Sequence, residues 1–114
     1  MRKRAYKGRC EKRVLGKCKE VCRTFDPIQT AYADSLQENY AIREFQCNVP
    51  LDDGEYMTDF LCVKADGELM VRECVQRGHL LKPMTVRMLD ISRTYWLRHG
   101  VEDWGIVIDA DEEG

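Results

Sequence analysis

The sequence predicts an α/β (α+β) fold, a single domain in which helices pack on a mixed central sheet. Its 114 residues favour one domain and can bury one core without metal or disulfide support. The periodic segments run in the order helix, three strands, helix, strand. A strand that returns after a helix is expected to pair parallel to an earlier strand. We expect a basic arm or helix over residues 1–25, the domain over 26–110 and an acidic tail over 111–114.

Two helices are expected within the domain. Residues 28–42 fit the first helix, with Leu36 and Tyr40 four residues apart on one face. Pro83 opens the second helix, where proline is favoured, and Gly100 is a natural stop. Apolar residues nearly encircle this second helix, which makes a homodimer, through this helix or through a sheet edge, an alternative to a monomer.

Two further patterns concern helix ends near the N-terminus. A basic helix is expected over residues 11–23 and should end at Asp26-Pro27. The stretch Ser35-Leu36-Gln37-Glu38 has the capping-box pattern of a helix start.

Four strands are expected. Residues 43–50 alternate apolar and polar side chains and are stopped by Pro50. Asp66-Gly67 supplies a tight turn between strands over about 55–64 and 68–76. The run 104–108 is almost wholly apolar, which is the pattern of a strand buried on both faces.

The N-terminal 23 residues are strongly basic, with ten Lys and Arg against two Glu, although the formal net charge of the chain is −2. A basic arm favours DNA or another polyanion as partner, and the alternative is a solubilising terminus. The candidate nucleic-acid-binding side chains are those of Arg2, Lys3, Arg4, Lys7, Arg9, Lys12 and Arg13.

The chain shows neither the apolar region of a signal peptide nor an apolar stretch of membrane-spanning length, which predicts a cytoplasmic protein with no membrane partner. We therefore expect its six cysteines to be reduced. The spacing of Cys10, Cys18 and Cys22 raises zinc as an alternative to an apolar helix face, although no paired fourth ligand follows. Three other cysteines lie in apolar strand-like runs and should be small buried hydrophobes: Cys47, Cys62 and Cys74.

One acidic residue stands in each of two adjacent predicted strands. Asp59 lies in the segment before the Asp66-Gly67 turn, and Glu73 lies in the segment after it. The two carboxylates are expected to be neighbours on the sheet, an arrangement that can bind a divalent metal ion through oxygen ligands.

Three stretches resemble the PD-(D/E)xK restriction-endonuclease-like superfamily and, within it, the N-terminal nuclease domain of TnsA, an endonuclease subunit of heteromeric transposases. Ser35-Leu36-Gln37-Glu38-Asn39-Tyr40 is similar to the family's first-helix segment. Tyr56-Met57-Thr58-Asp59-Phe60-Leu61 is similar to its strand that ends in proline- or threonine-aspartate-phenylalanine. Val71-Arg72-Glu73-Cys74-Val75 lies where the family has an acidic residue or glutamine, any residue and lysine. The likeness covers about residues 28–110.

The resemblance implies an αβββαβ core and a metal-dependent DNA endonuclease of a mobile genetic element, active in transposition. It implies that Glu38, Asp59 and Glu73 bind Mg²⁺ or Mn²⁺ against the scissile phosphate.

The sequence departs from the family at the lysine, which falls on Val75. Loss of one preorganised electrostatic group typically costs roughly 10²–10³ in rate. Lys82, Arg77 and Lys64 are the cations that could replace it, and Lys82, beyond the strand end, is the best placed.

The missing lysine leaves an alternative function on the same fold, a non-catalytic binding module. Such a module would suit a phage or conjugative-element inhibitor of a host nucleic-acid enzyme, for example a CRISPR effector. Its protein partner would then be that enzyme, whereas a TnsA-like endonuclease would bind a transposase subunit.

Overall fold

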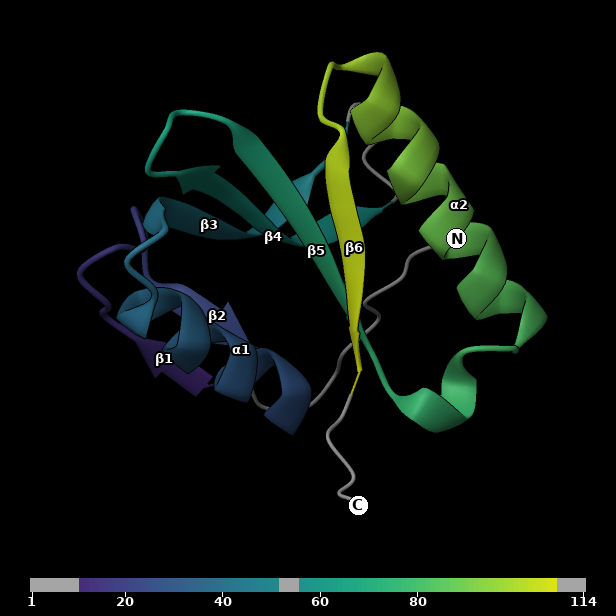
Figure 1. The fold of residues 1–114 in the computed structure, drawn as a ribbon. Helices are drawn as coiled ribbons and strands as arrows, with labels where there is room; N and C mark the ends of the chain where they lie inside the picture. Colours follow the sequence, from purple (N-terminus) through teal and green to yellow (C-terminus); the bar gives the residue numbers. More distant parts are fainter. Residues whose placement is uncertain (1–10, 52–55, 109–114) are drawn as a thin grey trace.

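In the computed structural model, residues 11–51 and 56–108 are described, and they form two α-helices and two sheets. The elements in chain order are β1 (Glu11–Arg13), β2 (Cys22–Thr24), α1 (Pro27–Glu38), β3 (Ile42–Pro50), β4 (Met57–Lys64), β5 (Leu69–Val75), the 3₁₀-helix η1 (Arg77–His79), α2 (Pro83–Arg98) and β6 (Asp103–Ile108) (Figure 1).

The main sheet has the strand order β3-β4-β5-β6. Strands β3, β4 and β5 are antiparallel, and β6 pairs parallel to β5 after the crossover through α2. Parallel neighbours need such a crossover because a tight turn can only reverse the chain. The predicted mixed sheet, and the predicted order from α1 to β6, are confirmed.

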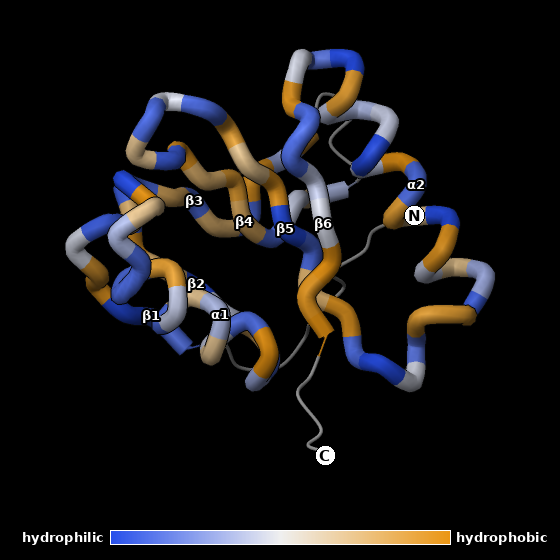
Figure 2. Tube along the Cα trace, viewed as in Figure 1, coloured by the Kyte–Doolittle hydropathy of each residue, from blue (hydrophilic) through white to orange (hydrophobic). Residues whose placement is uncertain are grey.

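The two helices cover opposite faces of the main sheet (Figure 1). Met70 and Cys74 of β5 pack in one core cluster with α1 residues, whereas Val71 packs in a second cluster with Trp96 of α2. Neighbouring side chains of a strand point to opposite faces, so this division follows from the alternation along β5. The tube of α2 alternates between hydrophobic and hydrophilic stretches, as expected of an amphipathic helix (Figure 2).

Helix α1 begins at the residues that were expected to end an earlier helix. The Asp26 carboxylate accepts a hydrogen bond of 2.8 Å from the Gln29 backbone N–H, and Pro27 occupies the first turn. This is an N-cap followed by a favoured proline. The capping-box pattern at Ser35 starts no helix, since that residue lies near the end of α1. The expected extension of this helix to residue 42 is wrong, because α1 ends at Glu38 and Tyr40 beyond it is 98% exposed.

The basic helix expected over residues 11–23 is also wrong, because β1 and β2 form a small antiparallel hairpin there. Cys22 and Thr24 are buried while Arg23 between them is exposed, which is the period of a strand with one covered face. The loop of the hairpin contacts the main sheet through a bridge between Cys18 and Phe45 of β3.

Helix α2 is the most accurately predicted element. It starts at Pro83, and His99 caps its end before Gly100, whose φ of +84° is the left-handed conformation that favours glycine. Strand β6 differs from expectation: it is the edge strand of the sheet, and Ile106 is 42% exposed rather than buried on both faces. No helix within the described residues is long and apolar enough to cross a membrane.

Candidate functional site around Asp59 and Glu73

Asp59 and Glu73 lie side by side, as their places in adjacent strands predicted. The backbone N–H of Asp59 donates a hydrogen bond of 3.0 Å to Glu73 Oε1. The two side chains are almost completely buried, with 1% and 0% of their surface exposed. A buried charge is stable only when other groups compensate it, so their partners decide what the pair does.

Two donors from different elements hold the Asp59 carboxylate. Gln29 Nε2 of α1 donates to Oδ1 at 2.9 Å, and the backbone N–H of Cys74 in β5 donates to Oδ2 at 2.7 Å. The Gln29 amide is itself fixed, because its Oε1 accepts from the Phe25 backbone N–H at 2.6 Å. The N-terminal turn of α1 therefore aims an N–H donor at Asp59.

The Glu73 carboxylate is connected to α2 and β6. Ser92 Oγ of α2 donates to Glu73 Oε2 at 2.6 Å, and Trp104 Nε1 of β6 donates to Ser92 Oγ at 3.0 Å. The resulting chain of hydrogen bonds, here called the carboxylate network, joins both helices to three strands of the main sheet. Its members are Gln29, Asp59, Glu73, Ser92 and Trp104.

The carboxylate network lies where β4 and β5 separate. Their last backbone pair on this side is Phe60 with Arg72. Immediately beyond it, the Cys74 N–H donates to the Asp59 carboxylate and the Asp59 N–H donates to the Glu73 carboxylate. Side-chain oxygens thus take the place of strand carbonyls and satisfy backbone donors that would otherwise be buried without a partner.

The donor set does not fit a catalytic Mg²⁺ or Mn²⁺ ion. Every oxygen of Asp59 and Glu73 accepts a hydrogen bond from a protein donor. Mg²⁺ normally keeps several waters and is bound near solvent and substrate phosphate, whereas these side chains are closed to solvent. Within the described residues, no third carboxylate, imidazole or thiol joins the pair to form a metal-binding group.

Glu38, the expected third ligand, is not brought to the pair. It is exposed at the last residue of α1, while Gln29 at the start of the same helix reaches Asp59. Nine residues of helix separate them, about 13 Å along the axis. Gln29 gave no chemical signal in the sequence, although the Asp26-Pro27 cap could have located the start of its helix.

Two of the expected cations, Lys64 and Lys82, are placed away from the pair. Val75, at the lysine position, is buried. Lys64 Nζ binds Asp103 Oδ2 at 2.7 Å, and Lys64 is five residues along β4 from Asp59, about 17 Å at the usual strand rise. Lys82 is exposed at the N-cap of α2, ten residues before Ser92 and so about 15 Å away along the helix axis.

Most of the expected nucleic-acid-binding arm lies outside the described residues: Arg2, Lys3, Arg4, Lys7 and Arg9. Of the two remaining candidates, Lys12 is exposed on β1. Arg13 is engaged within the protein, since its Nη1 binds Asp34 Oδ1 of α1 at 2.6 Å.

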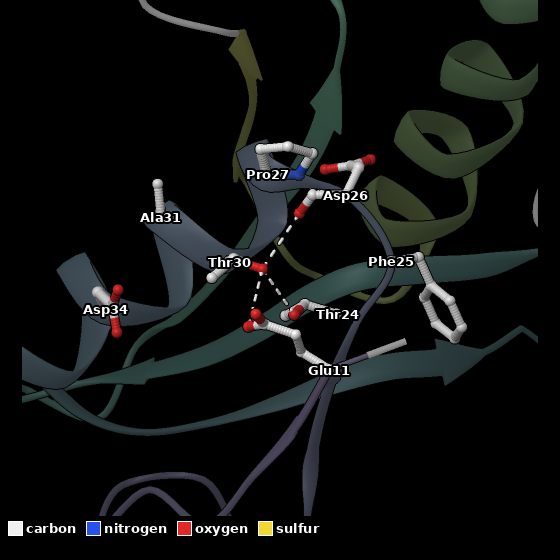
Figure 3. Close-up of a pocket in the computed structure, with 8 residues that line it drawn as sticks. All are labelled: Glu11, Thr24, Phe25, Asp26, Pro27, Thr30, Ala31 and Asp34. Atoms are coloured by element: carbon white, nitrogen blue, oxygen red, sulfur yellow. Dashed lines mark hydrogen bonds between the residues drawn. The ribbon is translucent and has the colours of Figure 1, made fainter. Parts of the chain in front are cut away.

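An open pocket of about 650 Å³ lies between the β1–β2 hairpin and α1 (Figure 3). Three acidic side chains line it, those of Glu11, Asp26 and Asp34. Thr24 and Thr30, which also line the pocket, share a hydrogen bond of 2.8 Å between their Oγ1 atoms (Figure 3). Among the described residues, no Lys or Arg lines this pocket, so its acidic lining does not favour a polyanion inside it.

The structure brings together three thiols that the sequence did not connect. Cys18 and Cys22 lie beside Cys47 of β3, while Cys10 is outside the described residues. Hydrogen bonding with Cys47 lowers the pKa of Cys22 to about 7, and the nearby Arg13 charge acts in the same direction. The expected reduced state agrees with the five described cysteines, which are free thiols.

Comparison with known proteins does not assign the chain to a family. No protein-family model matches it, and no curated protein matches it.

Proposed function

We propose that this protein is a non-catalytic nucleic-acid-binding module on a restriction-endonuclease-like fold of the TnsA type. The αβββαβ order and the mixed sheet support this fold, as do the acidic residues in β4 and β5. We infer the absence of catalysis from the closed carboxylate network. In it, each carboxylate oxygen of Asp59 and Glu73 accepts a hydrogen bond from a protein donor.

Metal-assisted cleavage of a phosphodiester needs a metal ion that touches both a water molecule and the phosphate. Asp59 and Glu73 are less than 2% exposed, so a phosphate cannot approach them without opening the sheet junction. Val75 supplies no positive charge beside them. The pair is better explained as a structural junction, in which the two carboxylates accept hydrogen bonds from backbone N–H groups where β4 and β5 diverge.

The binding part of the proposal rests on the exposed side of α2. Four cations are spread along this helix, at its N-cap and from its second turn to its last, and form no ion pair within the described residues: Lys82, Arg87, Arg93 and Arg98. These residues are here called the α2 surface. Asp90 is the one acidic residue of the helix. Such a surface attracts phosphates. Helix α2 lies across the main sheet from α1 (Figure 1), and α1 lines the acidic pocket.

A salt titration tests the α2 surface directly. The double variant Arg87→Gln/Arg93→Gln should bind duplex DNA at least about 10-fold more weakly and lower the salt slope by about 2, because each phosphate contact contributes about 0.9. The matched control is Arg23→Gln/Arg43→Gln, which removes the same charge from exposed residues of β2 and β3. Equal losses in both variants, or no binding by the wild type at low salt, would contradict the proposal.

A cleavage assay tests the absence of catalysis separately. Plasmid DNA with Mg²⁺ or Mn²⁺ should show the same background with the wild type and with Asp59→Asn. Cleavage by the wild type alone would replace this proposal with a TnsA-like metal-dependent endonuclease.

A further inference from the structure

A cluster of three thiols lies away from the carboxylate network, at the contact between the β1–β2 hairpin and the edge strand β3. Cys22 Sγ and Cys47 Sγ are 3.2 Å apart, and Cys18 Sγ and Cys47 Sγ are 3.9 Å apart. All three sulfur atoms lie within 4.8 Å of one another. They come from the hairpin loop, the start of β2 and the middle of β3.

We propose that Cys18, Cys22 and Cys47 form a zinc-binding site that fastens the β1–β2 hairpin to the main sheet. Zinc–thiolate bonds of about 2.3 Å in tetrahedral geometry place sulfur atoms about 3.8 Å apart. The observed separations of 3.2 and 3.9 Å lie on either side of that value. For zinc binding, the 3.2 Å separation of Cys22 and Cys47 would have to widen by about half an ångström.

The backbone already holds the three cysteines in place. The Phe45 N–H donates to the Lys17 carbonyl at 2.9 Å, and the Lys19 N–H donates to the Phe45 carbonyl at 3.3 Å, so Cys18 is fixed against β3. Cys22 pairs with Arg13 in the β1–β2 ladder. The spacing Cys18-x₃-Cys22 falls in the range of close ligand pairs in zinc sites, with Cys47 added by the fold.

The chemistry of the donors selects the class of metal. Three sulfur ligands favour Zn²⁺ or another thiophilic cation, and they disfavour Mg²⁺ and Mn²⁺, which prefer oxygen. On binding, each thiol releases its proton, and the three thiolates with Zn²⁺ carry a net charge of −1. Arg13 pairs with Cys22 in the β1–β2 ladder, and because its guanidinium also binds Asp34 Oδ1 at 2.6 Å, it offsets only part of this charge.

The proposed site has three protein ligands. Within the described residues, no further Cys, His, Asp or Glu joins the cluster. A tetrahedral zinc ion would then take water as its fourth ligand, approached from the side of Cys47, which is less buried than the other two cysteines. The gain is structural, because β1 and β2 have three residues each and bury little by themselves.

Co²⁺ titration of the reduced full chain tests the proposal, since Co²⁺ substitutes for Zn²⁺ and reports thiolate ligands by charge-transfer absorption. We expect one Co²⁺ per chain, displaced by Zn²⁺ and unaffected by millimolar Mg²⁺. Cys47→Ser should weaken binding by about 100-fold or more. The matched control, Cys62→Ala, removes a core thiol outside the cluster and should bind Co²⁺ like the wild type.

A second measurement keeps the test independent of folding defects in a variant. Zn²⁺ should raise the thermal midpoint of the wild type and of Cys62→Ala, and leave that of folded Cys47→Ser unchanged. The absence of a thiolate–Co²⁺ band in the wild type would overturn the proposal. So would equal Co²⁺ binding by Cys47→Ser, or equal loss of binding in Cys62→Ala.

Discussion

Replacing Asp59 with asparagine separates a structural carboxylate pair from a metal site, because the two roles predict opposite signs of the stability change. Asparagine keeps the shape of the side chain but has one oxygen and one NH₂ group. The oxygen can still accept from either Gln29 Nε2 or the Cys74 N–H, both of which now bind the carboxylate. The NH₂ group then faces the other donor without an acceptor between them.

The magnitude follows from these two contacts. A hydrogen bond to a charged group contributes about 1.5–3 kcal/mol, and a buried donor left without a partner costs about 1–3 kcal/mol. Partial relaxation makes the sum smaller, and we expect Asp59→Asn to lower the free energy of unfolding by about 3 kcal/mol. For a domain of this size that is a shift of about 1.5 M in the urea midpoint, with a slope near 2 kcal/mol/M.

Urea denaturation at neutral pH without divalent metal measures this difference. Asp90→Asn is the matched control, because it makes the same chemical change on an exposed residue of α2 and should alter stability by less than about 0.5 kcal/mol. Two carboxylates arranged for a metal ion repel each other in its absence, so neutralising one would stabilise the fold. An Asp59→Asn protein as stable as the wild type, or more stable, would refute the structural role.

Three other predictions concern the supports of the site and the sheet. Trp96 Nε1 donates to Thr58 Oγ1 at 2.7 Å in the core, and Thr58→Val removes this acceptor. The variant should be less stable by about 1–3 kcal/mol and should show changed tryptophan fluorescence. An unchanged urea midpoint would contradict this prediction. Gly67→Ala should cost about 1–2 kcal/mol in the same assay, because Gly67 has a φ of +92° in the β4–β5 turn, whereas Gly78→Ala, at negative φ, should cost less. The hydrogen bond from Lys64 and the Arg72 charge lower the pKa of Asp103 in the folded protein. The ionised carboxylate therefore stabilises the fold fully above its unfolded pKa of about 3.9. This stabilisation is lost as the pH falls through the lower pKa of the folded state. Wild type and Asp103→Asn should therefore differ in stability at pH 7 and converge in strong acid; a difference that persists there would exclude the linkage.

The sequence was sufficient for the parts of the fold that local chemistry determines. Asp66-Gly67 set the turn between β4 and β5, and the alternation of side chains then placed Asp59 beside Glu73. Pro83 marked the start of α2 because proline is pre-organised for a first turn. These signals act over a few residues and are therefore visible in the sequence.

Contacts between distant segments could not be predicted in the same way. Gln29 reaches Asp59 only because α1 starts at its Asp26 cap and crosses the sheet at that point, and the two residues are thirty positions apart. Cys47 joins Cys18 and Cys22 because the hairpin loop pairs with Phe45 of β3, an isolated bridge with no local signature. The burial of Glu73 depends on Ser92, which has no distinctive spacing in the sequence.

The carboxylate network and the α2 surface are physically connected through Ser92, and under the proposed function this connection gives the acidic pair a role in binding that needs no catalysis. Ser92 binds Glu73 on the inner side of α2, and the next turn packs Trp96 against Thr58. Both contacts fix the rotation of the helix, and that rotation decides which side chains face solvent. The cations of α2 are presented outward because the inner face is held by two polar contacts in addition to apolar packing. Under the proposed function, Asp59 and Glu73 therefore act by positioning the α2 surface.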